Sequence, residues 1–268
     1  MRRLVMFFLA LLCSSIVAVA QQHGPINPPA LFDKGMNALT GTGFSRNDLT
    51  GVDYIRQSAD LGYAPAQSAM GYFAEAGFGV PADPSQAATF YSKAAAQSDR
   101  VAQWVLGRMY FTGIGQGRNL SEAERWLGKA ANQGDPFAQF LLGSVKLERS
   151  DYTAAANWFR KAADQGLPQA QQQLGFLLMQ GRGVAVDKLG AYVQFLLSAE
   201  AGIQTTGEDV KHLGADLTNN QIEQAKNKMR DLQATTSRAL VSHGCTGWQG
   251  EFNAIPSTPP PDLQAFCR

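Results

Sequence analysis

Apolar and small residues return at fixed offsets along most of the chain. The stretch AQWVLGRMYFTGIG at 102–115 has close counterparts at 66–79 and 170–183, and weaker ones at 30–43 and 138–148. The leading alanines of these copies are separated by 36, 36, 36 and 32 residues. A repeat of this length predicts a solenoid in which every copy forms a pair of helices. The copies begin at Ala30, Ala66, Ala102, Ala138 and Ala170.

The first half of each copy predicts an amphipathic helix that ends at a glycine turn. A glycine follows five positions after each leading alanine, where it would cost a helix about 1 kcal/mol relative to alanine. We therefore expect it at a close crossing with another helix. In four copies a G-x-G sequence then ends the helix and supplies left-handed backbone for the turn. The mid-helix glycines are Gly35, Gly71, Gly107, Gly143 and Gly175.

The second half of each copy predicts another helix, which opens at an N-cap residue. Asn or Asp stands at this position in every copy, and its side chain can accept hydrogen bonds from the free amides of the first turn. A bulky pair and a small pair follow at helical spacing, as in Trp126-Leu127 and Ala130-Ala131. Stacked pairs would bury this face in one continuous core. The predicted caps are Asn47, Asp83, Asn119, Asp151 and Asp187.

Two further segments follow the fifth copy. Residues 209–214 (DVKHLG) resemble the start of another first helix, and a polar helix is predicted from Leu217 to about Ser237. Its apolar positions could cover the last exposed face of the stack, as a terminal cap must. The tail 241–268 is rich in glycine and proline and predicts irregular structure. The packing positions of the cap are Ile222, Ala225, Met229 and Leu232.

The complete pattern resembles the Sel1-like repeat, a relative of the tetratricopeptide repeat. The endings KAANQG at 129–134 and KAADQG at 161–166 are its most recognisable parts. The resemblance implies an all-α, right-handed α-solenoid with a helical C-terminal cap. The expected organisation is five repeats within 30–203, a half-repeat and capping helix over 204–240, and the tail 241–268. The repeats are expected at 30–65, 66–101, 102–137, 138–169 and 170–203.

The N-terminus has the layout of a cleaved secretory signal. Arg2 and Arg3 precede an apolar run, and the sequence AVA ends at Ala20. The apolar run is shorter than the ~18–20 residues that a membrane-spanning helix needs. We therefore expect residues 1–20 to be removed from a bacterial protein that is periplasmic or secreted, without stable membrane insertion.

Composition and charge restrict the classes of partner. With 45% hydrophobic and 17% charged residues, the chain is expected to fold. Its net charge is +1, and −1 without Arg2 and Arg3, which argues against nucleic acid as a partner. The two cysteines outside the signal, Cys245 and Cys267, predict a disulfide in an exported protein. His243 lies near them, but three scattered candidate ligands do not predict a metal site.

No catalytic residue is indicated. Residues 30–203 contain neither histidine nor cysteine, and the nucleophile, zinc and phosphate-loop motifs are missing from the sequence. We therefore expect a non-enzymatic scaffold without cofactor, as Sel1-like proteins generally are. Two alternatives stay open. Some cysteine-rich Sel1-like proteins are associated with β-lactam binding and hydrolysis, and some periplasmic relatives are structural parts of secretion or polysaccharide-export assemblies.

The resemblance also indicates a binding surface for a protein or peptide. In tetratricopeptide-like stacks, positions two, six and nine of the first helix face the concave side. Here they carry many aromatic residues, with Arg108 central and placed to meet a carboxylate or a backbone carbonyl. The alternative is that these side chains pack between neighbouring helices and fill the groove. The candidate residues are Phe32, Met36, Tyr72, Trp104, Arg108, Phe111, Phe140 and Phe176.

Overall fold

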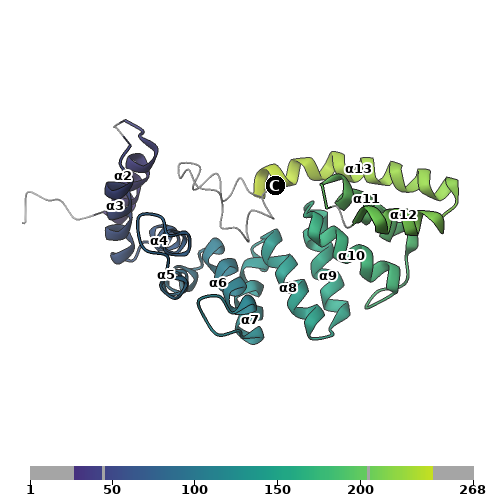
Figure 1. Ribbon diagram of the computed structural model, residues 1–268, viewed down its shortest axis with the longest axis horizontal. Coiled ribbons are helices and arrows are strands. Elements are labelled where there is room, and N and C mark those ends of the chain that lie inside the picture. The colour runs from purple at the N-terminus through teal and green to yellow at the C-terminus, as the bar shows by residue number, and fades with distance from the viewer. Residues whose placement is uncertain (1–26, 44–45, 204–205, 244–268) are drawn as a thin grey trace, which may run out of the picture.

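The computed structural model describes residues 27–43, 46–203 and 206–243. Within them the chain forms twelve α-helices and no strand, and each helix from α2 to α11 packs against the next one (Figure 1). The predicted all-α solenoid is confirmed. The first helices of the five pairs are α2 (Pro28–Thr40), α4 (Ala64–Ala76), α6 (Arg100–Thr112), α8 (Pro136–Glu148) and α10 (Pro168–Gln180). The second helices are α3 (Asp48–Asp60), α5 (Pro84–Ala96), α7 (Leu120–Asn132), α9 (Tyr152–Asp164) and α11 (Lys188–Glu200).

The pairs follow one another along a curved path. In the second and third pairs, the first helices α4 and α6 lie on its inner side and the second helices α5 and α7 on its outer side (Figure 1). Helix α6 contacts α8 directly, so the third and fourth pairs also meet through their first helices. Residues that face the interior of the curve are therefore close to the next repeat as well as to their own.

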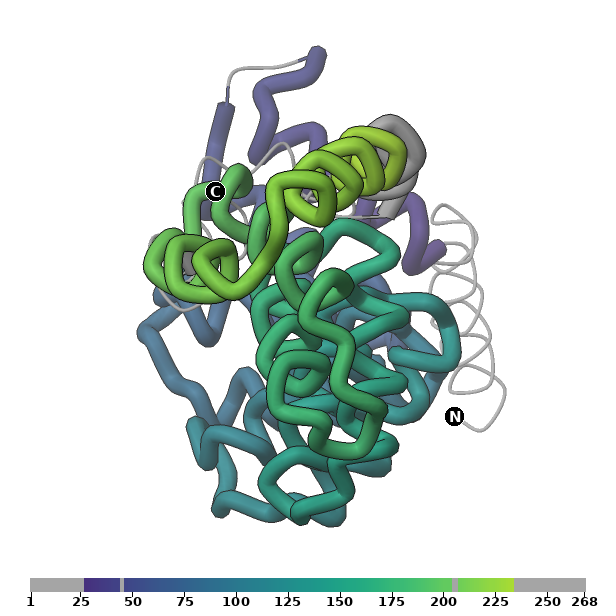
Figure 2. Tube along the Cα trace, turned by 90° about the vertical axis from the view of Figure 1, so that its right-hand side faces the viewer, coloured from purple at the N-terminus to yellow at the C-terminus, as the bar shows by residue number. Residues whose placement is uncertain are grey.

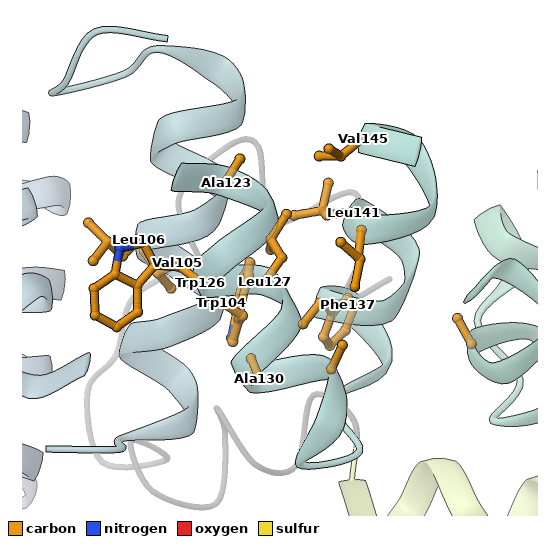
Figure 3. Packing of buried hydrophobic residues seen from close by; sticks show 14 of the residues in the cluster. Trp104, Val105, Leu106, Ala123, Trp126, Leu127, Ala130, Phe137, Leu141 and Val145 are labelled. Atoms are coloured by element: carbon orange, nitrogen blue, oxygen red, sulfur yellow. The ribbon is translucent and has the colours of Figure 1, made fainter. Parts of the chain in front are cut away.

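One hydrophobic core runs through the middle of the stack. It extends from Ala74 on α4 to Leu177 on α10, and the second to fifth pairs contribute side chains to it. Figure 3 shows the part between the third and fourth pairs, where Leu127 of α7 lies near Leu141 of α8. Separate clusters close the core at the N-terminal and C-terminal ends. No single pair could bury these faces alone, which is why the stack depends on its neighbours.

The mid-helix glycines lie where the two helices of a pair cross. A Cβ atom added to Gly107 would lie 2.6 Å from Cγ of Leu127, and one added to Gly143 would lie 2.7 Å from the Phe159 ring. These distances are too short for a carbon contact, so a larger residue would force the helices apart. The expected close crossing is confirmed.

The second glycine of the G-x-G turn joins consecutive pairs. Gly115, in the loop after α6, has a φ of 71°, and an added Cβ would overlap the carbonyl oxygen of Pro84 at the start of α5. Gly183, in the loop after α10, lies equally close to the backbone of Tyr152 at the start of α9. The turn was predicted, and its close contact with the preceding pair is an additional finding.

Asparagine and aspartate side chains cap the helices as predicted. Asn119 Oδ1 accepts hydrogen bonds from the amides of Ser121 and Glu122, at 3.0 and 3.1 Å. The other four predicted caps each accept at least one such bond. Asp99 and Asp135 also cap the first helices α6 and α8, which the sequence pattern did not predict.

Buried glutamines bridge three consecutive helices. Gln103 of α6 donates to the Ala95 carbonyl at the end of α5, at 3.2 Å. Its Oε1 accepts from Nε2 of Gln133, just after α7, at 2.7 Å. Equivalent pairs join Gln67 to Gln97 and Gln139 to Gln165. A buried amide without partners would cost about 1–3 kcal/mol, so each bridge ties a pair to the preceding one.

Ser98 takes a backbone conformation that glycine takes at the equivalent turns. Its φ is 69°, whereas Gly62, Gly134 and Gly166 have φ near 90°. A left-handed conformation costs a non-glycine residue roughly 1–2 kcal/mol, and glycine loses about 0.5–1 kcal/mol of chain entropy. We expect Ser98→Gly to raise the free energy of unfolding by about 0.5–1 kcal/mol in urea denaturation. Ser98→Ala is the control, and a Gly variant no more stable than the Ala variant would show that the turn is unstrained.

Helices α12 (Thr206–Ala215) and α13 (Asn219–His243) close the C-terminal end. Ala225 and Met229 of α13 are buried against α11, as the predicted cap requires, and Ile222 and Leu232 are half-buried beside them. Figure 2 shows α13 lying along one side of the stack. None of the described helices is long and apolar enough to cross a membrane. The expected signal and the Cys245–Cys267 disulfide lie outside the described residues.

Candidate binding surface

Three of the eight candidate groove residues are buried inside the stack. Tyr72, Trp104 and Arg108 expose only 2%, 3% and 4% of their surface. The expectation of an exposed stripe centred on Arg108 is therefore wrong for the middle of the inner side. The physical reason is that the first helices α4, α6 and α8 pack closely there, so that side chains fill the space between them.

Trp104 fills the space between two first helices. Its ring stacks on Phe137 of α8, with centroids 5.8 Å apart and an angle of 30° between the planes. Figure 3 shows the two rings at the lower edge of the contact between the third and fourth pairs. Offset aromatic pairs of this kind add stabilisation beyond their buried area. Trp104 is therefore an interior contact between repeats.

Arg108 forms a buried ion pair with Glu75 of α4. The guanidinium donates to Glu75 Oε1, and the two side chains are 5% and 7% exposed. The hydroxyl of Tyr91 on α5 donates to Glu75 Oε2 at 3.2 Å. Arg108 also lies over the Trp104 ring, with its guanidinium carbon 5.9 Å from the centroid. The carboxylate that meets Arg108 here is the chain's own.

Burial controls the protonation of Tyr91. Desolvation raises the pKa of its hydroxyl well above the ordinary value, and the negative charge of Glu75 raises it further. The phenol therefore stays protonated at neutral pH and remains a hydrogen-bond donor. Tyr91 also covers Gly71, where an added Cβ would lie 2.8 Å from its ring. One side chain thus serves both the helix crossing and the ion pair.

The other candidate residues keep part of their surface in solvent. Phe111 of α6, Phe140 of α8 and Phe176 of α10 are all half-buried, and we refer to them as the inner aromatic row. Phe140 leans on Phe159 of α9, with centroids 5.7 Å apart, and Phe176 on Phe195 of α11, at 5.1 Å. Three successive first helices therefore each present one supported aromatic side chain.

The remaining two candidates lie at the N-terminal end. Phe32 and Met36 of α2 are half-buried, and the Phe32 ring meets Tyr63 at 5.6 Å. They belong to the N-terminal hydrophobic cluster, whereas the inner aromatic row adjoins the middle and C-terminal clusters. The buried residues Tyr72, Trp104 and Arg108 separate the two groups along the first helices.

Glu75, Tyr91 and Phe137 are not among the eight candidate groove residues. The role of Glu75 could have been found from the sequence, because Glu75 and Arg108 carry opposite charges at inner positions of adjacent repeats. Opposite charges at such positions predict an ion pair between neighbouring first helices. Phe137 has no comparable signal, since it precedes the leading alanine of its copy and lies outside the expected inner positions.

The acidic side chains around the site serve the fold. Within 27–43, 46–203 and 206–243, no group of three His, Cys, Asp or Glu side chains could hold a metal ion. Asp135 has a raised pKa because it is buried, but it caps α8 and pairs with Arg100 at 2.6 Å. Its carboxylate therefore serves the fold. The side chains that keep part of their surface in solvent here are aromatic.

The fold and the inner side define an α-solenoid of the tetratricopeptide-like class. The chain belongs to the Sel1 repeat family: a sequence model of the Sel1 repeat matches it five times, and each match begins two residues before a leading alanine. Members of this family are generally protein–protein interaction modules. The matched residues are 28–63, 64–99, 100–135, 136–167 and 168–202.

Solved structures of Sel1 repeat proteins resemble the chain. One is a protective antigen of uropathogenic Escherichia coli with an SLR fold, which is 30% identical with a TM-score of 0.68. That match covers 85% of this chain and 48% of the antigen. A Sel1 repeat protein from Oxalobacter formigenes is 34% identical with a TM-score of 0.59, and the match covers 70% of this chain and 55% of that one. The chain thus matches about half the length of each of these proteins.

Proposed function

We propose that the chain is a non-enzymatic scaffold that binds a protein or peptide along the inner side of its solenoid. The observation that carries the proposal is the inner aromatic row, in which three successive first helices each present a half-buried phenylalanine. Aromatic side chains on a supported surface are effective anchors, because they bury a large area at a small entropic cost. A partner would cover the exposed edges of these rings.

The proposed binding surface includes fewer residues than the eight candidates that the sequence indicated. Tyr72, Trp104 and Arg108 form its support, because they fix the spacing of α4, α6 and α8 from within. Phe111 is held by Arg118, whose guanidinium lies 5.7 Å from the ring and donates to the Phe111 carbonyl at 2.9 Å. A surface held in place in this way loses little entropy when it binds.

We further propose that the protein works in the cell envelope or outside the cell. Two observations support this location. The N-terminal segment has the layout of a cleaved secretory signal, and the Escherichia coli relative is described as a protective antigen. The proposed partner is then an envelope or extracellular protein.

The proposal is tested by affinity capture from an envelope extract, using the chain expressed with its own N-terminal segment. Phe140→Ala removes the central anchor, and Trp158→Ala removes a half-buried aromatic residue from the outer helix α9 as a matched control. We expect a partner that the wild type and Trp158→Ala retain and that Phe140→Ala binds at least ~10-fold more weakly, as for an interface anchor. Equal capture by both variants would contradict the location of the binding surface on the inner side. Turnover of a chromogenic β-lactam would contradict the non-enzymatic assignment.

A further inference from the structure

We propose that residues 244–268 dock on the inner aromatic row and occupy the binding surface until a partner displaces them. The inference rests on the proposed function and assigns a regulation to the same surface. Three features carry it: the course of α13, the length of chain that follows it, and the chemistry of that segment.

Helix α13 carries the chain back over the inner side of the stack. Its first part is held at the C-terminal end, where Ala225 and Met229 are buried and Gln233 donates to Glu200 of α11. The helix then continues to His243. Figures 1 and 2 both place α13 along the open side of the curve, and in Figure 1 it ends above α8. In that view the end of α13 therefore lies above the helix that carries Phe140, although the repeats themselves end at α11.

The segment is long enough to follow the whole row. Its 25 residues could span roughly 80 Å when extended. Packed helices are about 8–10 Å apart, so the three first helices that carry the row cover only a few tens of ångströms. If Cys245 and Cys267 form the expected disulfide, the segment is a closed loop that still reaches roughly 35 Å from its base, which is enough to cover the row. Because the segment is covalently attached to α13, its effective concentration at the row would be about millimolar. A weak intrinsic affinity would therefore be enough for docking.

The composition of the segment fits an aromatic surface. It contains Trp248, Phe252 and Phe266, which are three aromatic anchors within a short stretch. The run Pro259-Pro260-Pro261 favours an extended polyproline conformation, which docks on aromatic grooves with little loss of entropy. An extended peptide with aromatic and proline residues is the kind of ligand that the inner aromatic row would select. The occupant proposed here is therefore a peptide of the chain itself.

Photo-crosslinking of the full chain tests the docking. Phe140→p-benzoylphenylalanine places the probe in the row, and Trp158→p-benzoylphenylalanine places it on the outer side as the matched control. Mass spectrometry of the monomer band should identify links from position 140 to peptides of 244–268, and none from position 158. Adding Trp248→Ala and Phe252→Ala to the probe variant should lower the yield about tenfold, as expected when an anchor is lost.

The outcomes separate this inference from the proposed function. Links from position 140 that appear only in a dimer band would overturn it in favour of a second copy. No link to 244–268, or equal links from both positions, would also overturn it. A partner whose capture depends on Phe140, found together with no link, would leave the proposed function standing and refute only the docked segment. We expect an added partner to lower the yield of links from position 140 in proportion to the fraction of the protein that it binds.

Discussion

Replacing Glu75 by glutamine will lower the free energy of unfolding by roughly 3–5 kcal/mol, because it leaves the buried Arg108 guanidinium without its counter-charge. The pair is 5% and 7% exposed, and Tyr91 shares the same carboxylate, so two buried donors lose their strongest acceptor together. Urea denaturation followed by circular dichroism measures the change. A loss of this size is a large part of the total stability of a typical domain.

Glu148→Gln is the matched control for this substitution. Glu148 pairs with Arg118 at 2.6 Å, but the two side chains are 39% and 50% exposed, so its loss should cost less than about 1 kcal/mol. The double variant Glu75→Gln/Arg108→Met should lose less than the sum of its single variants, because it leaves no buried charge alone. Equal effects of Glu75→Gln and Glu148→Gln would show that the inner pair is accessible to water in solution.

Gly115→Ala will lower the free energy of unfolding by about 2–4 kcal/mol. A left-handed backbone costs alanine roughly 1–2 kcal/mol, and the overlap with the Pro84 carbonyl adds an overpacking cost of about 1–3 kcal/mol. The obstacle is backbone at the start of α5, which can only move together with its helix. The third pair should therefore separate partly from the second, and unfolding should become less cooperative in the same denaturation experiment.

Gly128→Ala is the control for a glycine without such constraints. Gly128 lies inside α7, and no atom lies within 4 Å of an added Cβ beyond the helix's own backbone and its two chain neighbours. Alanine there should raise the free energy of unfolding by about 0.5–1 kcal/mol through helix propensity alone. We expect Gly115→Ala to lower the free energy of unfolding and Gly128→Ala to raise it. A destabilisation by both, or by neither, would contradict the contact between Gly115 and the preceding pair.

The repeat architecture could be predicted because its constraints are local. Gly107 and Asn119 each serve one helix crossing or one helix end, and such positions return with the period of the fold. The terminal cap was predictable in the same way from Ala225 and Met229, which lie on one face of a polar helix. These features require no knowledge of how one pair is oriented on the next.

The sequence could not predict which side chains of the inner side are buried, since their burial depends on the angle between successive pairs. Trp104 and Phe140 occupy equivalent positions in their copies, yet Trp104 is buried against Phe137 while Phe140 stays half-buried. The bridge between Gln103 and Gln133 was missed for a related reason. Each glutamine is a plain polar residue in the sequence, and only the packed stack brings the two amides together.

If the inner aromatic row is the binding surface of this Sel1 repeat protein, partner affinity must depend on Phe140 and not on Trp158. The most direct test is a calorimetric titration of the captured partner into the wild type, Phe140→Ala and Trp158→Ala, with circular dichroism confirming that all three are folded. We expect Phe140→Ala to raise the dissociation constant at least ~10-fold and Trp158→Ala to leave it nearly unchanged. A dissociation constant raised by Trp158→Ala and unchanged by Phe140→Ala would place the surface on the outer helices and contradict the account.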